Sequence, residues 1–211
     1  MNYAESRAGY ANLLRATRIR PERRAAAMRV AAVALTHRER YEAVALPGMP
    51  WWWVAAVHSL ESGADWATHL HNGDPLARRT VHVPAGRPLA GGPPYTWEES
   101  ARDALLMHHL DSVPTWGVER CLYEWERYNG FGYVSRGVNS PYLWAGTTQY
   151  SVGKYTADGR FSATAVSGQI GAVAIMLAVN GERGIAIDRS LIPAPRAAAT
   201  GFIEVIRRWF L

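Results

Sequence analysis

One stretch limits the fold more than any other: residues 50–62, PWWWVAAVHSLES, are almost entirely apolar and carry three consecutive tryptophans. Pro50 suits the first turn of a helix, and Gly63 suits the residue that ends one. A helix that is apolar on most of its faces has to be buried within a domain. We therefore expect a buried helix here, with Glu61 on its last turn.

The rest of the chain also favours helices. The Thr96-x-x-Glu99 pattern is a capping box that opens a helix. Residues 63–95 are rich in Gly and Pro, which predicts irregular chain with one short extended piece at 80–84. The predicted fold is mainly α, a single helical domain whose long irregular insertion has room for a short β-hairpin. The other predicted helices span residues 21–45, 97–110, 115–128 and 162–179, the last closed by Asn180 and Gly181.

The length of 211 residues suits one domain. We expect the domain to span residues 1–180, including a basic N-terminal helical segment, and residues 181–211 to form a linker and an amphipathic tail. The tail, GFIEVIRRWFL, could dock on the domain or lie on a membrane surface, and docking is favoured. The longest apolar run, IGAVAIMLAV, is too short to cross a bilayer as a helix. The N-terminus lacks the features of a secretory signal peptide.

The positive charge is concentrated at the start of the chain. The formal net charge is +5, whereas residues 1–40 hold nine Arg against three Glu, a local +6. Such a segment attracts nucleic acid, anionic lipid or an acidic wall polymer, although a solvated Arg-rich helix face is the simpler interpretation. The single cysteine, Cys121, excludes an internal disulfide and a thiolate-cluster zinc site, and we expect it to be a buried thiol.

A polar cluster follows the apolar helix. His58, Glu61, His69, His71 and Asp74 are all plausible zinc ligands, and they lie close together in sequence. Their spacing matches no standard zinc motif, because there is no H-E-x-x-H. The sequence therefore predicts no metal site, and a zinc enzyme that uses His58, His69 and His71 remains as an alternative.

Acid catalysis needs fewer of these residues than zinc binding does. A glutamate at the end of a tryptophan-rich helix loses hydration, which raises its pKa and leaves it protonated near neutral pH. Such a group can donate a proton to a glycosidic oxygen, with a second carboxylate positioning water. Asp74 and Asp65 are the local candidates for that second group, and Glu126 is the alternative. A glutamate at a helix end is nevertheless common, so the pattern alone is weak.

Two motifs in order carry a resemblance to a known superfamily. Glu61-Ser62-Gly63 ends one helix, and Tyr128-Asn129-Gly130 ends another far downstream. This pattern resembles lytic transglycosylases and goose-type lysozymes. The strings HLHNGDPLARRTVHVPAGRP, PPYTWEESARDAL and YNGFGYVSRGVNSPYLWAGTTQYSVGKYTADGRF more closely resemble phage endolysins and bacterial lysozyme-like peptidoglycan hydrolases, from about residue 10 to residue 180. The chain departs from the transglycosylase pattern because HLHNGDPL replaces the Gly-Leu-Met-Gln string.

The resemblance implies an α+β lysozyme-like fold and a site. It implies that Glu61 is the general acid and that Tyr128, Asn129 and Gly130 line the sugar groove. Asp74 lies thirteen residues beyond Glu61, similar to the spacing of a water-positioning Asp in goose-type enzymes. Further predicted groove residues are His58, Tyr133, Tyr142 and Trp144, the last three because aromatic rings stack on sugars.

The expected activity is cleavage of the β-1,4 bond between N-acetylmuramic acid and N-acetylglucosamine, without a cofactor, by hydrolysis or by anhydro-forming transglycosylation. The expected partners are peptidoglycan strands and, through the basic segment, an anionic wall polymer or outer-membrane surface, but not nucleic acid. We expect a monomer made in the host cytoplasm that reaches the periplasm or cell wall after holin action. The alternatives are a zinc-dependent peptidoglycan amidase or endopeptidase that uses His58, His69 and His71, and a non-catalytic wall-binding or virion module.

Overall fold

The apolar stretch forms the predicted buried helix in the computed structural model, which describes residues 1–157 and 159–183. Helix α4 (Trp51–Ser62) follows the extended Pro50 and ends at Gly63, whose φ of 64° is left-handed. Nine of its twelve residues are buried. The sequence prediction of a buried helix with Glu61 on its last turn is therefore confirmed.

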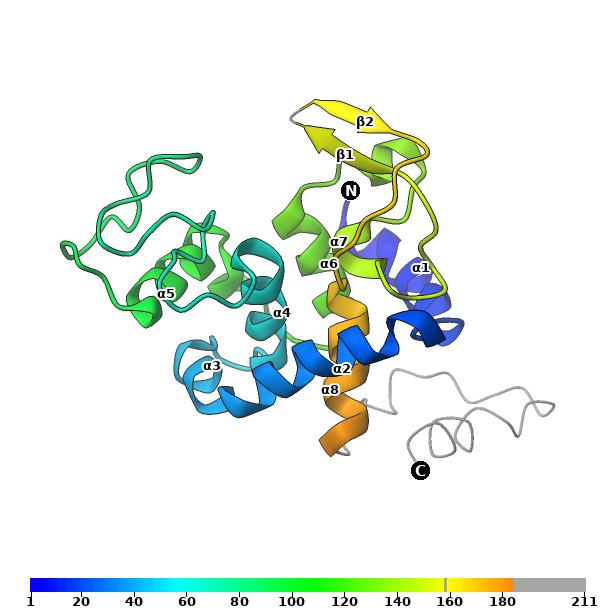
Figure 1. The fold of residues 1–211 in the computed structure, drawn as a ribbon, viewed down its shortest axis with the longest axis horizontal. Helices are drawn as coiled ribbons and strands as arrows, with labels where there is room; N and C mark the ends of the chain where they lie inside the picture. Colours follow the sequence, from blue (N-terminus) through cyan, green and yellow to red (C-terminus); the bar gives the residue numbers. More distant parts are fainter. Residues whose placement is uncertain (158, 184–211) are drawn as a thin grey trace.

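The described part is mainly helical with one small antiparallel sheet, as the sequence predicts (Figure 1). The remaining elements are α1 (Tyr3–Arg15), α2 (Pro21–Thr36), α3 (Arg38–Val44), α5 (Trp97–Met107), η1 (Leu110–Ser112), α6 (Val118–Asn129), η2 (Val134–Arg136), α7 (Pro141–Trp144), β1 (Lys154–Ala157), β2 (Arg160–Ser162) and α8 (Ala172–Arg183). The predicted capping box of α5 is present, with Thr96 and Glu99 bonding each other's backbone N–H groups.

Indole side chains fasten α4 to α6 across the core. Trp53 Nε1 donates to the carbonyl of Cys121 at 3.1 Å, and Trp125 Nε1 donates to the carbonyl of Trp53 at 3.3 Å. The rings of Trp53 and Trp125 lie nearly parallel, 8° apart, with centroids separated by 6.1 Å. These contacts fix the relative position of the two helices, and Cys121 is the expected buried thiol between them.

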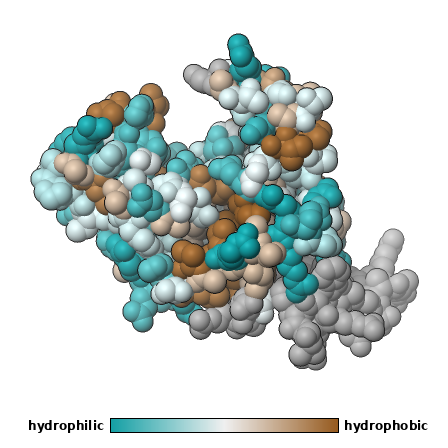
Figure 2. Space-filling view, in the orientation of Figure 1, coloured by the Kyte–Doolittle hydropathy of each residue, from teal (hydrophilic) through white to brown (hydrophobic). Residues whose placement is uncertain are grey.

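The other helices enclose α4 and divide the molecule into two sides. Helix α8 packs on α2, α4 and α7, and α3 packs on α4 and α5. Figure 1 shows the 63–95 insertion and α5 on one side of α4, and α1, α7 and the β1–β2 hairpin on the other. Figure 2 shows that the surface is hollowed between these two sides. The last turn of α4 therefore emerges where two separate parts of the chain face each other.

Two predicted elements differ from the structure before residue 96. The single helix predicted over 21–45 is two helices, α2 and α3, which are separated at His37. The extended piece predicted at 80–84 is not a strand. Thr80 and Arg87 instead close a loop, in which Thr80 N–H donates to the Arg87 carbonyl and Gly86 N–H donates to the Thr80 carbonyl, each at 2.8 Å.

The hairpin and the last helix also differ from expectation. The hairpin lies at 154–162 and not in the insertion, with Tyr155 opposite Phe161. The helix predicted over 162–179 starts only at Ala172, because the preceding segment bonds to the neighbouring loop: Gly153 N–H donates to the Ala165 carbonyl. The helix also continues past Asn180 and Gly181, which therefore do not end it.

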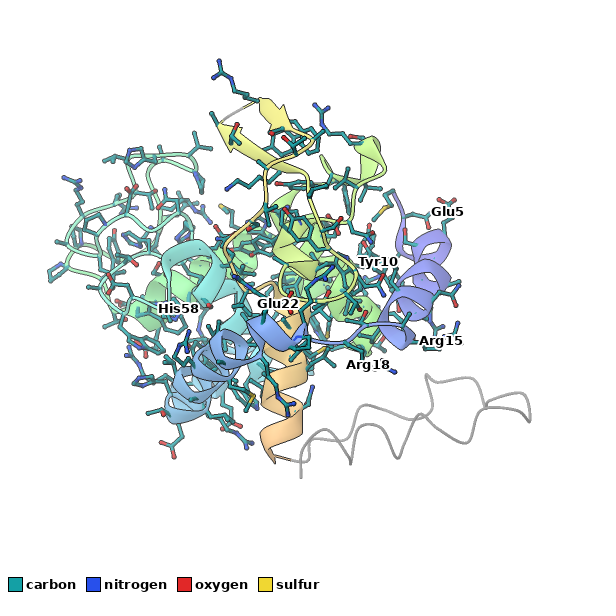
Figure 3. The ribbon with its side chains drawn as sticks, turned by 45° about the vertical axis from the view of Figure 1, so that its right-hand side comes forward. Glu5, Tyr10, Arg15, Arg18, Glu22 and His58 are labelled. Atoms are coloured by element: carbon teal, nitrogen blue, oxygen red, sulfur yellow. The ribbon has the colours of Figure 1, made fainter. Side chains whose placement is uncertain are left out.

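Two arginines of the basic N-terminal segment bind the backbone of segments that lie far away in the sequence. Arg20 donates to the carbonyls of Thr147 and Tyr150, each at 3.0 Å, and Arg23 donates to the carbonyls of Gly168 and Gln169. Arg15 and Arg18 lie near the end of α1, far from His58 (Figure 3). Because Arg20 and Arg23 bond to carbonyls, these contacts leave their positive charge uncompensated.

The amphipathic C-terminal tail and most of the predicted 181–211 segment lie outside the described residues, so docking of the tail stays a prediction. Among the described residues, no helix is both long and apolar enough to span a bilayer.

Gly171 provides a test of how closely α7 and α8 approach. A Cβ added at Gly171 would lie 2.5 Å from the Leu143 carbonyl oxygen and 2.7 Å from the Ala145 nitrogen. Because both are backbone atoms, Gly171→Ala should lower the free energy of unfolding by about 1–3 kcal/mol or more, measured by urea denaturation. Gly168→Ala is the matched control, since a Cβ there meets nothing within 4 Å. Equal midpoints for the two variants would contradict the close approach.

Candidate active site

Glu61 is the central residue of the site. It lies on the last turn of α4, where its side chain is half-buried, and Tyr142 of α7 donates a hydrogen bond from its hydroxyl to Glu61 Oε1 at 2.8 Å. Burial raises the pKa of Glu61 to about 7, and the hydrogen bond from Tyr142 acts in the opposite direction. A substantial fraction of Glu61 is therefore protonated at neutral pH, as the sequence predicts for a glutamate in this setting.

Tyr128 brings a third element to the site. It comes from the end of α6, its ring packs edge-on against Trp53, and its hydroxyl donates to the Leu70 carbonyl at 3.4 Å. Burial raises the pKa of Tyr128, and the negative charge of Glu61 raises it further. Glu61 of α4, Tyr128 of α6 and Tyr142 of α7 thus form one group, although they are far apart in sequence.

The insertion and the segment before α8 flank the end of α4. The Asn72-Gly73-Asp74 turn packs against it so closely that a Cβ at Gly73 would lie 3.5 Å from the Glu61 carbonyl oxygen. On another face, Gln169 donates from its side chain to the Leu60 carbonyl at 3.4 Å. Glu61 is therefore held between the two sides that border the surface hollow.

Asn129 and Gly130 end α6 beside this group and are exposed. Gly130 has a φ of 84°, which a glycine adopts readily. Asn129 Nδ2 reaches Ser140 Oγ at 3.5 Å, so the motif is tied to the start of α7. Their predicted role in lining a sugar groove stays a prediction that their exposure favours.

The carboxylate of Asp74 holds the loop of the insertion together. Its Oδ2 accepts from Asn72 Nδ2 and from the backbone N–H groups of Val81 and His82, and its Oδ1 accepts from His82 Nδ1. Burial opposes ionisation of Asp74, but hydrogen bonds from His82 and Val81 outweigh it and lower its pKa well below the usual range. The carboxylate is ionised and engaged on both oxygens, so its predicted catalytic role gains no support from its contacts.

Glu126, the alternative second carboxylate, is buried on α6 with only 3% of its surface exposed. Burial raises its pKa to about 7, and a hydrogen bond with the Ser140 side chain opposes that rise. A carboxyl enclosed in this way offers little surface to a substrate. The prediction that Glu126 is a second catalytic group therefore gains no support from its burial.

His58 belongs to the core and not to the groove. Its ring is fully buried, with Nδ1 3.0 Å from the Tyr41 hydroxyl and Nε2 3.1 Å from the Asp65 carbonyl oxygen (Figure 3). Burial lowers its pKa to about 4. The prediction that His58 lines the pocket is corrected, because both ring nitrogens fasten the turn after α4 to α3.

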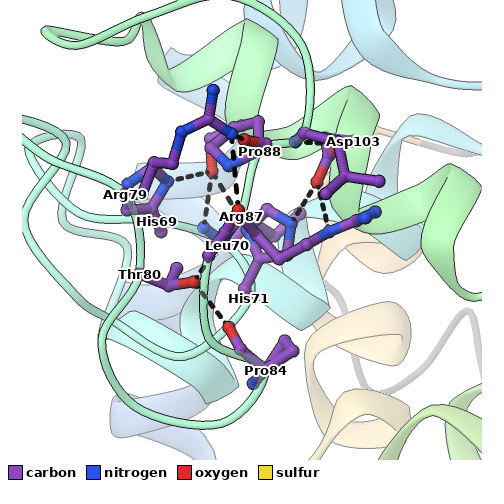
Figure 4. Close-up of polar contacts among 12 residues, drawn as sticks. His69, Leu70, His71, Arg79, Thr80, Pro84, Arg87, Pro88 and Asp103 are labelled. Carbon is purple, nitrogen blue, oxygen red and sulfur yellow. Dashed lines mark hydrogen bonds and ion pairs between the residues drawn. The ribbon is translucent and has the colours of Figure 1, made fainter.

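His69 and His71 brace the insertion against α5, as Figure 4 shows in part. His69 Nδ1 lies 2.8 Å from Ser100 Oγ and its Nε2 lies 2.8 Å from the Arg78 carbonyl oxygen. His71 Nε2 lies 2.7 Å from Asp103 Oδ2, which also pairs with Arg87 Nε at 2.9 Å. Within residues 1–157 and 159–183, no three His, Cys, Asp or Glu side chains form a candidate metal site.

Two of the predicted sugar-stacking aromatic residues are packed inside. Trp144 has only 1% of its surface exposed and belongs to the core. Tyr133 has 9% exposed, and its hydroxyl accepts from the Tyr155 N–H while its ring meets Tyr155 and Phe161 of the hairpin. Their burial gives no support to the prediction that these two rings stack on sugars. Tyr142 acts through its hydroxyl on Glu61, a role that its sequence position did not indicate.

The structure adds His108 to the group. Its ring stacks on Tyr128 with centroids 3.9 Å apart and planes 25° apart, and the Arg127 side chain donates to its carbonyl. Burial lowers the pKa of His108 to about 4, with Arg127 adding to the effect, so the ring is neutral at neutral pH. Nothing in the local sequence around His108 signals this contact, because it depends on the packing of α5 against the end of α6.

No known protein family, curated protein or solved structure matches the chain in any of the three comparisons that were made.

The buried state of His58 can be measured through its effect on stability. The unfolded ring binds a proton near pH 6.5, whereas the native ring binds one only near pH 4, so the protein loses stability as the pH falls from about 6.5 towards 4. In His58→Phe the slope of unfolding free energy against pH in this window should decrease by up to about one proton. Denaturant titrations at a series of pH values provide the measurement.

Tyr41→Phe is the matched control for His58→Phe. It removes the hydroxyl that contacts Nδ1 but keeps the titrating ring, so it should lower stability and retain most of the pH slope. A slope that His58→Phe leaves unchanged would show that His58 is accessible to protons in the native state.

Proposed function

We propose that the protein cleaves the β-1,4 glycosidic bond between N-acetylmuramic acid and N-acetylglucosamine in peptidoglycan, with Glu61 as the general acid. The observation that carries the proposal is the state of Glu61, a half-buried carboxyl with a pKa of about 7 on the last turn of α4, which the insertion contacts at Gly73 and the segment before α8 contacts at Gln169. The resemblance of the Glu61-Ser62-Gly63 and Tyr128-Asn129-Gly130 motifs to those of lytic transglycosylases and goose-type lysozymes supplies the substrate class.

The pKa of Glu61 suits proton donation to a leaving oxygen. A carboxyl with an ordinary pKa is almost fully ionised at neutral pH and has no proton to give, whereas one with a pKa near 7 is partly protonated. The protonated carboxyl donates to the glycosidic oxygen as the bond to the anomeric carbon breaks. Tyr142 then stabilises the resulting carboxylate through the hydrogen bond that it already makes to Oε1.

A single carboxyl can complete the reaction. The pKa of Glu61 is set by burial and by Tyr142, without a contribution from another carboxylate among the described residues. Asp74 is engaged on both oxygens, and Glu126 is enclosed in the core. We therefore propose that ionised Glu61 takes the proton back from the incoming nucleophile. Water as the nucleophile gives hydrolysed ends, and the C6 hydroxyl of the sugar gives anhydro ends.

The alternatives have less support. A zinc enzyme needs histidine nitrogens free for the metal, but both nitrogens of His58 and of His69 lie within hydrogen-bond distance of protein groups. A non-catalytic module has no need for a partly exposed glutamate whose pKa is raised to about 7. We further propose that the protein acts on the wall after holin-mediated release, with the basic N-terminal segment attracting an anionic surface or polymer.

Replacing the proposed acid is the direct test. Glu61→Gln keeps the size of the side chain and can still accept from Tyr142, but it has no carboxyl proton to donate. We expect kcat on purified peptidoglycan to fall by at least about 100-fold. Mass spectrometry of the released muropeptides measures the loss, and in the wild-type protein it separates hydrolysed from anhydro ends by the mass of one water.

Glu119→Gln is the control for that substitution, because Glu119 is a buried carboxyl on the first turn of α6, at the opposite end of the helix from Tyr128. It should retain activity. Full activity of Glu61→Gln would contradict the proposed acid, and wild-type cleavage that yields free amino groups and stops in a chelator would favour a zinc amidase or endopeptidase.

The pH dependence follows from the protonation of Glu61. Because the acid form is the active one, kcat should fall as the pH rises through about 7. Tyr142→Phe removes a hydrogen bond that favours the ionised carboxylate, so the pKa of Glu61 should rise and the alkaline limb should move up by about half a unit to one unit. Rates measured from pH 5 to 9 provide the test, and a limb that moves downward would contradict this account of Tyr142.

A further inference from the structure

The insertion presents apolar side chains to solvent. Val83 and Leu89 have 90% and 70% of their surfaces exposed, more than any other large apolar residue in the described part of the chain, and Val81 has 55% exposed. All three lie within one short loop of the insertion, and Figure 2 shows apolar surface on this side of the molecule. Exposed apolar side chains that gather in one place are typical of a surface that contacts a partner.

Hydrogen bonds hold this loop in one conformation. Besides the two backbone bonds that close it between Thr80 and Arg87, the Arg87 N–H donates to Thr80 Oγ1 at 2.9 Å. Asp74 Oδ2 accepts from the Val81 N–H at 2.8 Å. Because the backbone is fixed, the apolar side chains stay at the surface, and the loop loses little conformational entropy when it binds a partner.

Positive charge borders the same loop. Residues 75–97 contain three Arg and no Asp or Glu. The Arg79 side chain donates to three backbone carbonyls within residues 86–91, so its guanidinium lies beside the chain that carries Leu89. Carbonyls accept these bonds without neutralising the charge. Arg78 is exposed, so this face of the insertion combines apolar side chains with positive charge.

One of the three arginines is already paired, since Arg87 Nε lies 2.9 Å from Asp103 Oδ2. Arg78 and Arg79 form no ion pair with the described residues. Two positive charges therefore remain for an anionic partner.

Exposed aliphatic side chains next to arginines match the layers of an anionic lipid bilayer. A bilayer takes up aliphatic side chains at its acyl boundary, while its phosphate groups attract arginines at the surface. Figure 1 shows that the insertion extends outward from α4, where a flat partner can reach it. The two aromatic residues of this stretch, Tyr95 and Trp97, are buried. The loop therefore lacks the exposed rings that typically anchor a protein partner or stack on a sugar.

We propose that the insertion docks on an anionic lipid bilayer. Val81, Val83 and Leu89 enter the acyl boundary, and Arg78 and Arg79 lie at the level of the lipid phosphates. This inference goes beyond the proposed function and does not depend on it, because the contact needs neither Glu61 nor a glycan.

A fluorophore at the loop tests the contact directly. The single cysteine, Cys121, is fully buried, so Val83→Cys adds an exposed thiol that an environment-sensitive fluorophore can label. With vesicles of equal parts phosphatidylglycerol and phosphatidylcholine, the emission should move to shorter wavelength, and nitroxide-labelled lipids should quench it. The same label on Val166→Cys is the matched control and should change little, because Val166 is 59% exposed but lies in the segment before α8.

Co-sedimentation with the same vesicles measures the affinity. The double variant Val83→Asp/Leu89→Asp places two charges where apolar contact is proposed, and it should bind at least about tenfold more weakly. Val152→Asp/Val166→Asp is the matched control, because it changes the net charge equally at two exposed valines outside the insertion. It should weaken binding by less than about threefold, since charges far from the lipid surface are screened.

The electrostatic part of the contact is tested with one arginine. Arg78→Gln should weaken binding to the anionic vesicles by about fivefold, and Arg160→Gln, at an exposed position of β2, should have a smaller effect. Vesicles of phosphatidylcholine alone should bind the wild-type protein more weakly than the mixed vesicles do. All substituted positions are exposed, so the midpoints of urea denaturation should stay close to that of the wild-type protein.

Three results would overturn the proposal: no binding of the wild-type protein to the anionic vesicles, no response of the label at position 83, or equal losses of affinity in the two double variants. A dimer that Val83→Asp/Leu89→Asp abolishes, without binding to vesicles, would instead assign the surface to a second copy of the chain. A loss of binding to purified peptidoglycan, again without binding to vesicles, would assign it to the glycan.

Discussion

The enclosure of α4 is the constraint on which the rest of the structure depends. A helix with three consecutive tryptophans can be stable in water only if other elements cover it on nearly every side, and α3, α6 and α8 do so. The same enclosure removes water from the last turn of the helix, and this desolvation raises the pKa of Glu61. The core that stabilises the domain and the environment that tunes the proposed acid are therefore one feature.

The insertion is held by polar contacts instead of a core of its own. His69 and His71 converge on Ser100, Asp103 pairs with both His71 and Arg87, and Asp74 gathers the backbone N–H groups of the following loop. Such a network keeps an irregular segment in one conformation, because each buried polar group is satisfied only when its partners are in place. A rigid insertion in turn gives the surface hollow a defined wall beside α4.

Local patterns in the sequence predicted what depends on neighbours in the chain. Helix α4 with its end at Gly63 and the capping box at Thr96 follow from residues within a few positions of one another. The roles of Tyr142 and His108 depend on contacts between α4 and α7 and between α5 and α6, which no local pattern reveals. The late start of α8 also reflects a contact between segments, since the Gly153 N–H donates to the Ala165 carbonyl in the stretch before the helix.

His58 shows why proximity to Glu61 in the sequence does not identify a groove residue. In the sequence, His58, His69 and His71 all lie near Glu61 and are all plausible as ligands. In the structure their ring nitrogens face protein groups, which only the burial and the partners of each ring reveal. Trp144 shows the same limit for aromatic residues, since an irregular stretch rich in rings can supply either a groove or a core. A short segment of sequence shows which side chains are present. Whether these side chains are buried or exposed depends on how the rest of the chain packs against them.

Glu61 and Glu126 show that a raised pKa and access to a substrate are two different properties of a carboxyl group. Burial raises the pKa of each carboxyl to about 7, against the effect of a side-chain hydroxyl group, that of Tyr142 for Glu61 and that of Ser140 for Glu126. Their difference is access: Glu61 is half-buried at the end of its helix, whereas Glu126 has 3% of its surface exposed. A perturbed pKa therefore identifies groups that the fold holds under constraint, and contact with the groove decides which of them can exchange a proton with a substrate.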